Sequence, residues 1–292
     1  MPKTAQAITQ TEKDLLLQQI EILKQEVSLL QMLLANLQSA SDPAGITAQS
    51  YLAVNLSDYS VVLEKNQNQP YPIASVAKLM NAVVALENID KTQTITLTEE
   101  MLKPLGSSPS LFRGLTVGAE NLLKASLIQS TNDAAEALAY AVGKEKFTNL
   151  MNQKAKELGM SNTVFYDTHG LNLANLSTAS DLAKLISYIR GYHPEILSIT
   201  RDNNFWLPDA TGRKLKFQNV NNFYPLPAFI GGKAGYLPEA RQTLAAVFNV
   251  NGDAIVVVVL HSINRQADTF RILNQLGREK LIASRMIQNE KA

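Results

Sequence analysis

The 292-residue chain contains no cysteine and only three histidines. The absence of cysteine excludes disulfide bonds, thiolate nucleophiles and cysteine-based metal sites, and it is only weak evidence for an oxidising location outside the cytoplasm. The histidines, His169, His193 and His261, are widely spaced and lie outside any metal-ligand motif. They offer no evident Ser-His-Asp triad, and the chain has no Gly-x-Ser-x-Gly turn. We interpret His169 as a structural residue.

The chain also lacks long apolar runs and an excess of one charge. Its longest strongly apolar run, residues 254–260, is far too short to span a membrane, and its first residues are too polar for a signal peptide. The formal net charge is +1 without a long basic run, which argues against nucleic acid or an anionic membrane surface as the main partner. An apolar content of 46% is sufficient for a catalytic domain of ordinary size plus a small additional element.

The N-terminal part predicts a separate element. Residues 1–10 are expected to be disordered, residues 11–38 to form one long amphipathic, coiled-coil-like helix, and residues 39–45 to form a linker. Apolar residues recur in the helix at alternating intervals of four and three: Leu16, Ile20, Leu23, Val27, Leu30, Leu34 and Leu37. Further apolar residues widen this seam, so self-association and docking onto the catalytic domain fit the pattern equally well.

Residues 46–288 are predicted to form one α+β domain. Two β-rich runs, 48–56 and 60–64, flank a hairpin turn at 57–58, and later runs at 204–207, 215–218, 242–250 and 254–260 also have strand character. A turn at 251–253 joins the last two. Between these ends, helical spacing covers 75–87, 122–128, 133–142, 146–158 and 179–190, with Gly143, Gly159 and Gly191 as stops, and a final helix covers 267–287. We therefore expect a mainly antiparallel sheet formed by both ends of the domain, with an inserted helical lobe and a cleft at their junction.

The stretch that organises this domain is residues 72–80, the predicted opening of a helix. Residues three apart lie on one helical face, so Ser75 and Lys78 can present a hydroxyl and an amine to the same point. A lysine whose pKa is lowered by burial and cationic neighbours can remove the proton from a serine nucleophile. Free backbone N–H groups at a helix start can also stabilise an oxyanion. Alone, however, Ser-x-x-Lys is common, and serine is an ordinary helix cap.

Two further segments supply partners for Ser75. Ser130 and Asn132 lie at the break between two helices, where side chains can point into a cleft, although helix capping alone would explain them. Lys233 and Gly235 lie on a late strand edge, where glycines permit close approach of a substrate backbone. In isolation, a surface turn with a solvated lysine explains this second segment equally well.

The order Ser-x-x-Lys, Ser-x-Asn and Lys-x-Gly is the signature set of penicillin-recognising serine enzymes. With these motifs and the segments 71–75, 106–108, 129–135, 151–163, 169–171 and 177–183, the sequence resembles the D-alanyl-D-alanine carboxypeptidases of peptidase family S11 over residues 46–277. The resemblance implies a β-lactamase/transpeptidase-like fold and a serine carboxypeptidase of the cell envelope, outside the cytoplasm. Neither an export signal nor a membrane anchor is visible. The separate C-terminal β-domain of the family is not apparent, and the N-terminal helix is not part of the usual pattern.

The resemblance also implies a mechanism that uses neither metal nor cofactor. The substrate would be the D-Ala-D-Ala end of peptidoglycan stem peptides, and β-lactams would acylate the same serine. Ser75 would attack the penultimate D-Ala carbonyl, Lys78 would take its proton, and the backbone N–H groups of Ser75 and Tyr236 would hold the oxyanion. Ser130, between Lys78 and Lys233, would pass a proton to the leaving amine. The remaining motif residues, Asn132 and Gly235, would orient Lys78 and the substrate.

One position departs from the family pattern. The third motif normally has Thr or Ser after its lysine, and here that residue is Ala234. Loss of a hydroxyl bonded to the substrate carboxylate corresponds to roughly 1.5–3 kcal/mol, or about a ten- to hundredfold loss in rate. Arg265 stands where the family places a carboxylate-binding arginine, although it also fits a surface position at a strand end. Arg241 is a second candidate cation.

Two alternatives therefore stay open beside a working carboxypeptidase. The first is a catalytically weak or inactive relative that binds cell-wall peptide or serves as a scaffold, as Ala234 and the N-terminal helix suggest. The second, less favoured, is a serine β-lactamase. The sequence contains no Glu-x-x-Leu-Asn segment that would supply the deacylating glutamate of class A β-lactamases.

Overall fold

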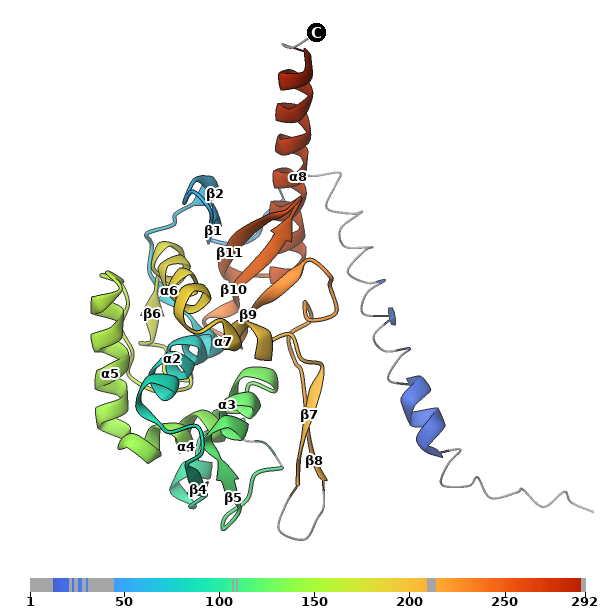
Figure 1. Ribbon diagram of the computed structural model, residues 1–292. Helices are drawn as coiled ribbons and strands as arrows, with labels where there is room; N and C mark the ends of the chain where they lie inside the picture. The colour runs from blue at the N-terminus through green and yellow to red at the C-terminus, as the bar shows by residue number, and fades with distance from the viewer. Residues whose placement is uncertain are drawn as a thin grey trace, which may run out of the picture.

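The computed structural model describes residues 13–20, 23, 26–27, 30, 45–106, 108, 110–208 and 214–289. Its centre is a five-stranded antiparallel sheet in the order β2-β1-β11-β10-β9 (Figure 1). The strands are β1 (Ser50–Asn55), β2 (Val61–Lys65), β9 (Phe229–Leu237), β10 (Arg241–Val250) and β11 (Asp253–Ser262). The first and last segments of the domain thus pair as β1 with β11, which confirms the predicted sheet formed by both ends of the domain.

The two faces of the sheet are buried against different helices, which explains the long apolar runs in β10 and β11. Alternate residues of a strand point to opposite faces. Val256 and Val258 therefore pack with α6 (Ala179–Tyr192) in one core, whereas Val257 and Val259 pack with Phe270 of α8 (Arg265–Asn289) in another. The two helices cover opposite faces of the sheet, as Figure 1 shows for α6 and α8. A strand that is buried on both faces has a nearly continuous run of apolar residues in its sequence.

The helical lobe lies between the two sheet-forming ends, as predicted (Figure 1). It begins with a 3₁₀ turn, η1 (Ala74–Ala77), and continues with α2 (Lys78–Asn88), α3 (Ala119–Ile128), α4 (Asn132–Val142), α5 (Lys144–Glu157), α6 and α7 (Pro194–Ile199). Gly143 and Gly159 follow α4 and α5 with positive φ, in agreement with their predicted role as stops. Gly191 does not end a helix, because α6 continues through it to Tyr192.

Several short elements were not predicted from the sequence. These are η2 (Glu100–Leu102), α7, and the two-stranded pairs β3 (Tyr71–Pro72) with β6 (Leu176–Ser177) and β4 (Thr94–Thr96) with β5 (Thr116–Gly118). Strands of two or three residues are too short to show a period of two, and tertiary packing determines them. The predicted strands at 204–207 and 215–218 form the hairpin of β7 (Asn204–Pro208) and β8 (Lys214–Gln218).

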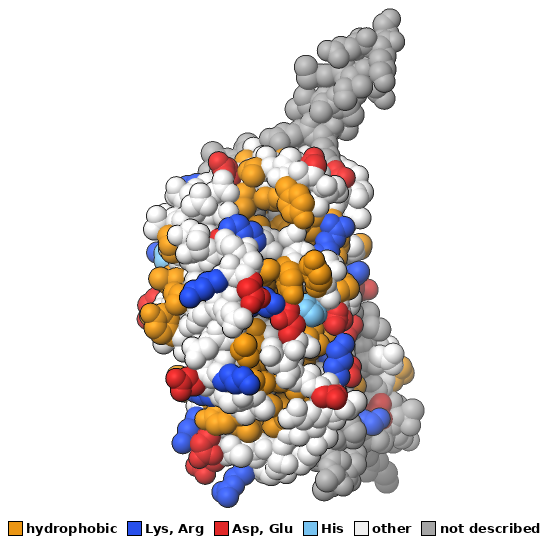
Figure 2. All heavy atoms as spheres, turned by 60° about the vertical axis from the view of Figure 1, so that its left-hand side comes forward, with side chains coloured by type: hydrophobic (Ala, Val, Ile, Leu, Met, Phe, Trp, Pro, Cys, Tyr) orange, Lys and Arg blue, Asp and Glu red, His pale blue; other side chains and the backbone are white. Residues whose placement is uncertain are grey.

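The division into an N-terminal helix, a linker and a catalytic domain remains a prediction. Residues 1–10 and most of 21–44 lie outside the described residues, and residues 13–20 within the predicted helix are helical. No described helix is long and apolar enough to cross a membrane. On the face drawn in Figure 2, acidic and basic side chains are interspersed without a large region of one sign. That face therefore offers no basic surface of the kind that binds nucleic acid.

Gly170 allows the loop before β6 to approach the η1 turn. Its φ is +94°, and a Cβ added there would lie 2.0 Å from the carbonyl oxygen of Ala74. Gly252, in the β10–β11 turn, has a similar φ of +92°, but a Cβ there would meet nothing within 4 Å. Substitutions at Gly170 and Gly252 therefore distinguish the effect of a positive φ from the effect of close contact with neighbouring atoms.

Gly170→Ala is expected to destabilise the protein more than Gly252→Ala. Both substitutions place a side chain at positive φ, which costs roughly 1–2 kcal/mol. Only Gly170→Ala also forces overlap with backbone atoms, which adds about 1–3 kcal/mol. Thermal unfolding followed by circular dichroism measures the difference. Equal losses of melting temperature would show that the contact of the Gly170 loop with the η1 turn is not tight in solution.

Candidate active site

Ser75 lies in the η1 turn, where the β-sheet meets the helical lobe. The prediction that Ser75 opens an α-helix needs correction, because residues 74–77 form a 3₁₀ turn and the α-helix begins at Lys78. The backbone is held on both sides: Ile73 donates its N–H to Asn175 (3.1 Å), and the Ile73 carbonyl accepts the buried hydroxyl of Thr243 (3.0 Å). These bonds fix the turn that presents the Ser75 side chain.

Lys78 is fully buried beside Ser75. Its Nζ donates to Ser75 Oγ at 3.0 Å, to Asn132 Oδ1 at 2.6 Å and to the carbonyl oxygen of His169 at 2.7 Å. The three acceptors come from the η1 turn, helix α4 and the loop before β6, so this one amine joins three segments that are distant in sequence. An ammonium group has three donors, and here each has a partner.

Burial lowers the pKa of Lys78 to about 7, although the carboxylates of Asp167 and Asp133 act in the opposite direction. Burial also raises the pKa of Asp133 to about 6, against the backbone N–H bonds that its oxygens accept from Ser108 and Ala134, each at 2.9 Å. Lys78 can therefore exchange its proton near neutral pH, as a general base for serine must.

Ser130 and Asn132 lie at the break between α3 and α4, as predicted. Asn132 is the first residue of α4, is buried, and donates its amide to the carbonyl oxygen of Leu105. Its oxygen is thereby directed toward Lys78. Ser130 has a φ of +63°, an uncommon conformation for a residue with a side chain. Such strained positions often occur at functional sites.

Lys233 and Gly235 lie on β9, the edge strand of the sheet. Lys233 is buried and donates from Nζ to the carbonyl oxygen of Ala234 at 2.9 Å. Burial and the charges of Lys78 and Arg265 lower its pKa well below the ordinary lysine value. A Cβ added to Gly235 would lie 2.8 Å from the backbone nitrogen of Ser75. The strand edge therefore passes directly beside the η1 turn, with Tyr236 following on the same strand.

Arg265 is the first residue of α8, not a surface arginine at a strand end. Its Nη1 donates to the carbonyl oxygen of Gly235 at 3.0 Å, and burial lowers its pKa. Ala234 is buried with the apolar residues that pack against α8. Arg241, the second candidate cation, is exposed and lies at the start of β10.

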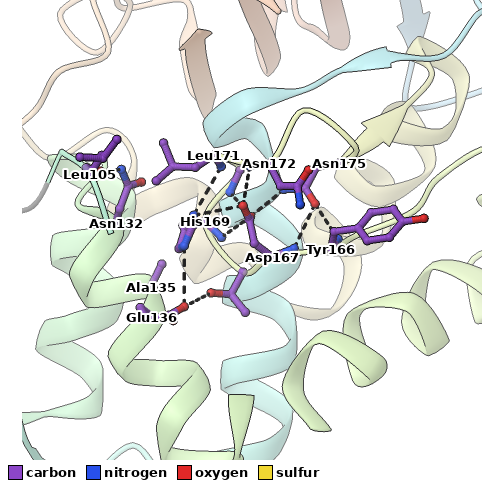
Figure 3. Close-up of polar contacts among 12 residues, drawn as sticks. Leu105, Asn132, Ala135, Glu136, Tyr166, Asp167, His169, Leu171, Asn172 and Asn175 are labelled. Carbon is purple, nitrogen blue, oxygen red and sulfur yellow. Dashed lines mark hydrogen bonds and ion pairs between the residues drawn. The ribbon is translucent and has the colours of Figure 1, made fainter. Parts of the chain in front are cut away.

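Sequence reasoning missed Asp167, which organises the loop that supplies the third acceptor to Lys78 (Figure 3). One of its oxygens accepts the backbone N–H groups of His169 (3.1 Å) and Gly170 (2.6 Å) and the side-chain amide of Asn175 (2.6 Å), and the other accepts the N–H of Asn172. Burial opposes the charge of Asp167, but His169 and these bonds outweigh it and lower the pKa of Asp167. The run Asp-x-x-x-x-Asn was the available signal, since both residue types favour such side-chain to backbone bonds.

A second buried acid, Glu136 of α4, supports the same loop from below (Figure 3). It accepts the hydroxyl of Thr168 at 3.0 Å, lies 3.8 Å from His169 Nε2, and pairs with Lys144. Asn81, one turn after Lys78, donates to the carbonyl oxygens of Ala135 and Thr168. The polar contacts of His169 agree with its interpretation as a structural residue, while its backbone carbonyl takes part in the site.

Comparison with solved structures places this arrangement in the class of D,D-peptidases. A D-alanyl-D-alanine carboxypeptidase from Mycobacterium tuberculosis superposes with a TM-score of 0.74 at 26% identity, covering 80% of this chain and 94% of that chain. A mutant of the DD-transpeptidase of Streptomyces K15 superposes with a TM-score of 0.72 at 26% identity, covering 78% and 97%.

The sequence comparisons define the family. The profile described as D-alanyl-D-alanine carboxypeptidase matches residues 36–264. The D-alanyl-D-alanine endopeptidase of Escherichia coli is 34% identical over 241 residues, which is 78% of this chain and 75% of that protein. The D-alanyl-D-alanine carboxypeptidase DacB2 of Mycobacterium tuberculosis is 29% identical over 226 residues, 75% of this chain and 76% of that protein. The chain therefore belongs to the D-alanyl-D-alanine carboxypeptidase family, peptidase family S11.

Asp167→Asn is expected to lower the pKa of Lys78 further below about 7. Burial lowers the pKa of Lys78, and the negative charge of Asp167 raises it. Removal of that charge therefore lowers the pKa further. An NMR titration of the lysine side chains, with the Lys78 signal assigned by its loss in Lys78→Met, measures the shift. Asp133→Asn should give a smaller shift, and Asp90→Asn, in an exposed turn, should give none. An unchanged or raised pKa in Asp167→Asn would contradict this electrostatic account.

Proposed function

We propose that the protein is a serine D-alanyl-D-alanine carboxypeptidase that acts on peptidoglycan stem peptides through an acyl-enzyme on Ser75. The observation that carries the proposal is the 3.0 Å bond between Lys78 Nζ and Ser75 Oγ, made by an amine whose pKa is about 7. Family membership supplies the substrate class and supports sensitivity to β-lactams. It also supports action in the cell envelope.

In the acylation step, Lys78 accepts the proton of Ser75 while Oγ attacks the carbonyl carbon of the penultimate D-Ala. The negative charge that develops on the carbonyl oxygen is held by the backbone N–H groups of Ser75 and Tyr236. The close approach of Gly235 to the nitrogen of Ser75 supports this pairing, because it brings the β9 edge and the η1 turn to one point. Asn132 and the His169 carbonyl hold the lysine amine in line with Oγ.

The C–N bond then breaks, and the leaving amine takes a proton that Ser130 passes on from Lys78. Lys233 contributes a positive charge on the opposite side of this path. The lowering of its pKa by the charges of Lys78 and Arg265 supports a common site, since like charges that affect each other in this way are neighbours. Water subsequently releases the acyl group from Ser75, which restores the enzyme.

A second candidate is a catalytically weak relative that retains peptide binding, which Ala234 favours. The side chain at position 234 cannot donate to a substrate carboxylate, so the contact falls to Arg265. In the less favoured β-lactamase alternative, the acyl-enzyme formed with penicillin would be hydrolysed rapidly. These alternatives share the acylation of Ser75 and differ in the fate of the acyl group, so one experiment separates them.

Fluorescent penicillin is expected to label the protein covalently, and a peptide ending in D-Ala-D-Ala is expected to release D-Ala. Both activities should be lost in Ser75→Ala, because among the described residues Ser75 has the one hydroxyl that hydrogen-bonds to Lys78 Nζ. Gel fluorescence and a D-Ala assay measure them. Labelling without D-Ala release would support the weak relative, and rapid loss of label with penicillin turnover would support the β-lactamase. No labelling and no release by the wild-type protein would contradict the proposal.

Ala234→Thr is expected to raise kcat/KM for D-Ala release by about ten- to a hundredfold. The added hydroxyl restores a hydrogen bond to the substrate carboxylate, worth roughly 1.5–3 kcal/mol. Ala234→Val, which matches threonine in shape without its hydroxyl, is the control for changes in packing. Equal effects of threonine and valine would show that the missing hydroxyl does not limit the rate.

A further inference from the structure

An apolar cavity of about 430 Å³ lies among the helices of the lobe. Its walls come from α2, α3, α4 and α7, of which α2, α3 and α7 contact one another (Figure 1). None of its lining residues hydrogen-bonds to Lys78 or belongs to the predicted active site. A cavity of this volume with apolar walls is typical of sites that bind small ligands. The apolar part of the lining includes Leu86, Ile89, Leu123, Leu138 and Ile199.

The exposed part of the lining, its rim, is charged and has one acid in excess. Lys91 Nζ lies 3.3 Å from Glu195 Oε1, and Lys124 Nζ lies 2.6 Å from Glu120 Oε1. The remaining acid of the lining, Asp202, is exposed, and no described residue forms an ion pair with its carboxylate. An apolar interior with one unpaired carboxylate at its rim complements a ligand that has an apolar body and one cationic group.

The helices that line the cavity also carry residues of the candidate active site. α2 begins with Lys78, and its last turns line the cavity about 10–16 Å further along the helix axis. α4 begins with Asn132. The residue after α7, Thr200, accepts the backbone N–H of Gly232 at 2.8 Å, directly before Lys233 in β9. A ligand that changes how these helices pack would therefore change the relative positions of Lys78, Asn132 and Lys233.

We propose that this cavity binds a small ligand with an apolar body and one cationic group, and that the bound ligand slows the reaction of Ser75. The second half of the proposal rests on the proposed function. The apolar body displaces water from between α2, α3 and α7, and the cationic group pairs with Asp202. Because the rate depends on close alignment of the nucleophile and its base, a change in helix packing lowers it.

Three probes with the same apolar body test the binding. Phenylbutylamine carries a positive charge, butylbenzene no charge and phenylbutyrate a negative charge. Methyl NMR of the full chain follows the signals of Ile89 and Ile199, each assigned by its loss on substitution with valine. The amine is expected to shift both signals and to bind more tightly than the neutral probe, and the acid is expected to bind most weakly. Equal affinities of the amine and the acid, or no shift of either signal, would overturn the proposal.

Two variants examine the two parts of the site. Asp202→Asn is expected to weaken binding of the amine about two- to fivefold, as for an exposed ion pair, without affecting butylbenzene. Asp58→Asn, in the exposed β1–β2 turn, is its control. Ser198→Trp places a large side chain into the cavity from an exposed position and should abolish binding, whereas Ser161→Trp, in an exposed turn outside the lining, should not. Circular dichroism melting verifies that each variant is folded, and unchanged binding of the amine by both folded cavity variants would contradict the assignment.

Saturating phenylbutylamine is expected to slow the labelling of Ser75 by fluorescent penicillin at least about fivefold, the lower end of typical coupling between two sites. The effect should be absent in Ser198→Trp. Binding in the cavity with an unchanged labelling rate would overturn the regulatory half of the proposal. Absence of labelling and of D-Ala release without any probe would instead show that the proposed function is wrong, and the NMR titration would still decide whether the cavity binds the amine.

Discussion

The structure depends on the burial of one amine. Lys78 Nζ has no access to water, and a buried charge without partners is strongly destabilising. Here three oxygens, from Ser75, Asn132 and His169, take the place of water. Because these oxygens come from the η1 turn, helix α4 and the loop before β6, the chain can satisfy the amine only when these parts of the helical lobe have packed together. The hydrogen bonds of Lys78 therefore form the centre of the site and also connect the segments that contribute to it.

The loop at residues 167–175 shows how much structure is needed to supply one of those oxygens. A backbone carbonyl keeps one direction only if the peptide unit that carries it is held in place by other contacts. Asp167 does this by accepting four hydrogen bonds from its own loop, and Gly170 allows that loop to lie against the η1 turn. Asn175 completes the contact by accepting the N–H of Ile73 at its backbone carbonyl, two residues before Ser75. The position of Ser75 is thus set partly by a loop that follows it by nearly a hundred residues.

Sequence reasoning was most informative where side chains stand in short motifs. Ser75, Lys78 and Asn132 were predicted as one site, and Ser75 and Asn132 lie within hydrogen-bond distance of Lys78. Strands with clear apolar runs were also predicted, but their order in the sheet was not. Sequence reasoning could not identify the backbone group in the site, because no sequence pattern shows that the His169 carbonyl oxygen accepts a hydrogen bond from Lys78. It also failed for the two-residue strands β3 and β6, whose pairing depends on packing. The role expected for Arg265 stays a prediction, and its contact with the Gly235 carbonyl depends on where α8 begins, which no motif shows.

The alternation of β9 gives the substitution at position 234 a structural meaning. Gly235 faces the nitrogen of Ser75, whereas Ala234 faces the side of the sheet that α8 covers, where it is buried with Phe270. In the proposed function, a hydroxyl at position 234 would hold the substrate carboxylate at the strand itself. With alanine there, that contact falls in the same proposal to Arg265, whose Nη1 donates to the carbonyl oxygen of Gly235 at 3.0 Å. Arg265 is thereby held against β9, so a cation remains beside position 234 although the hydroxyl of the family pattern is missing.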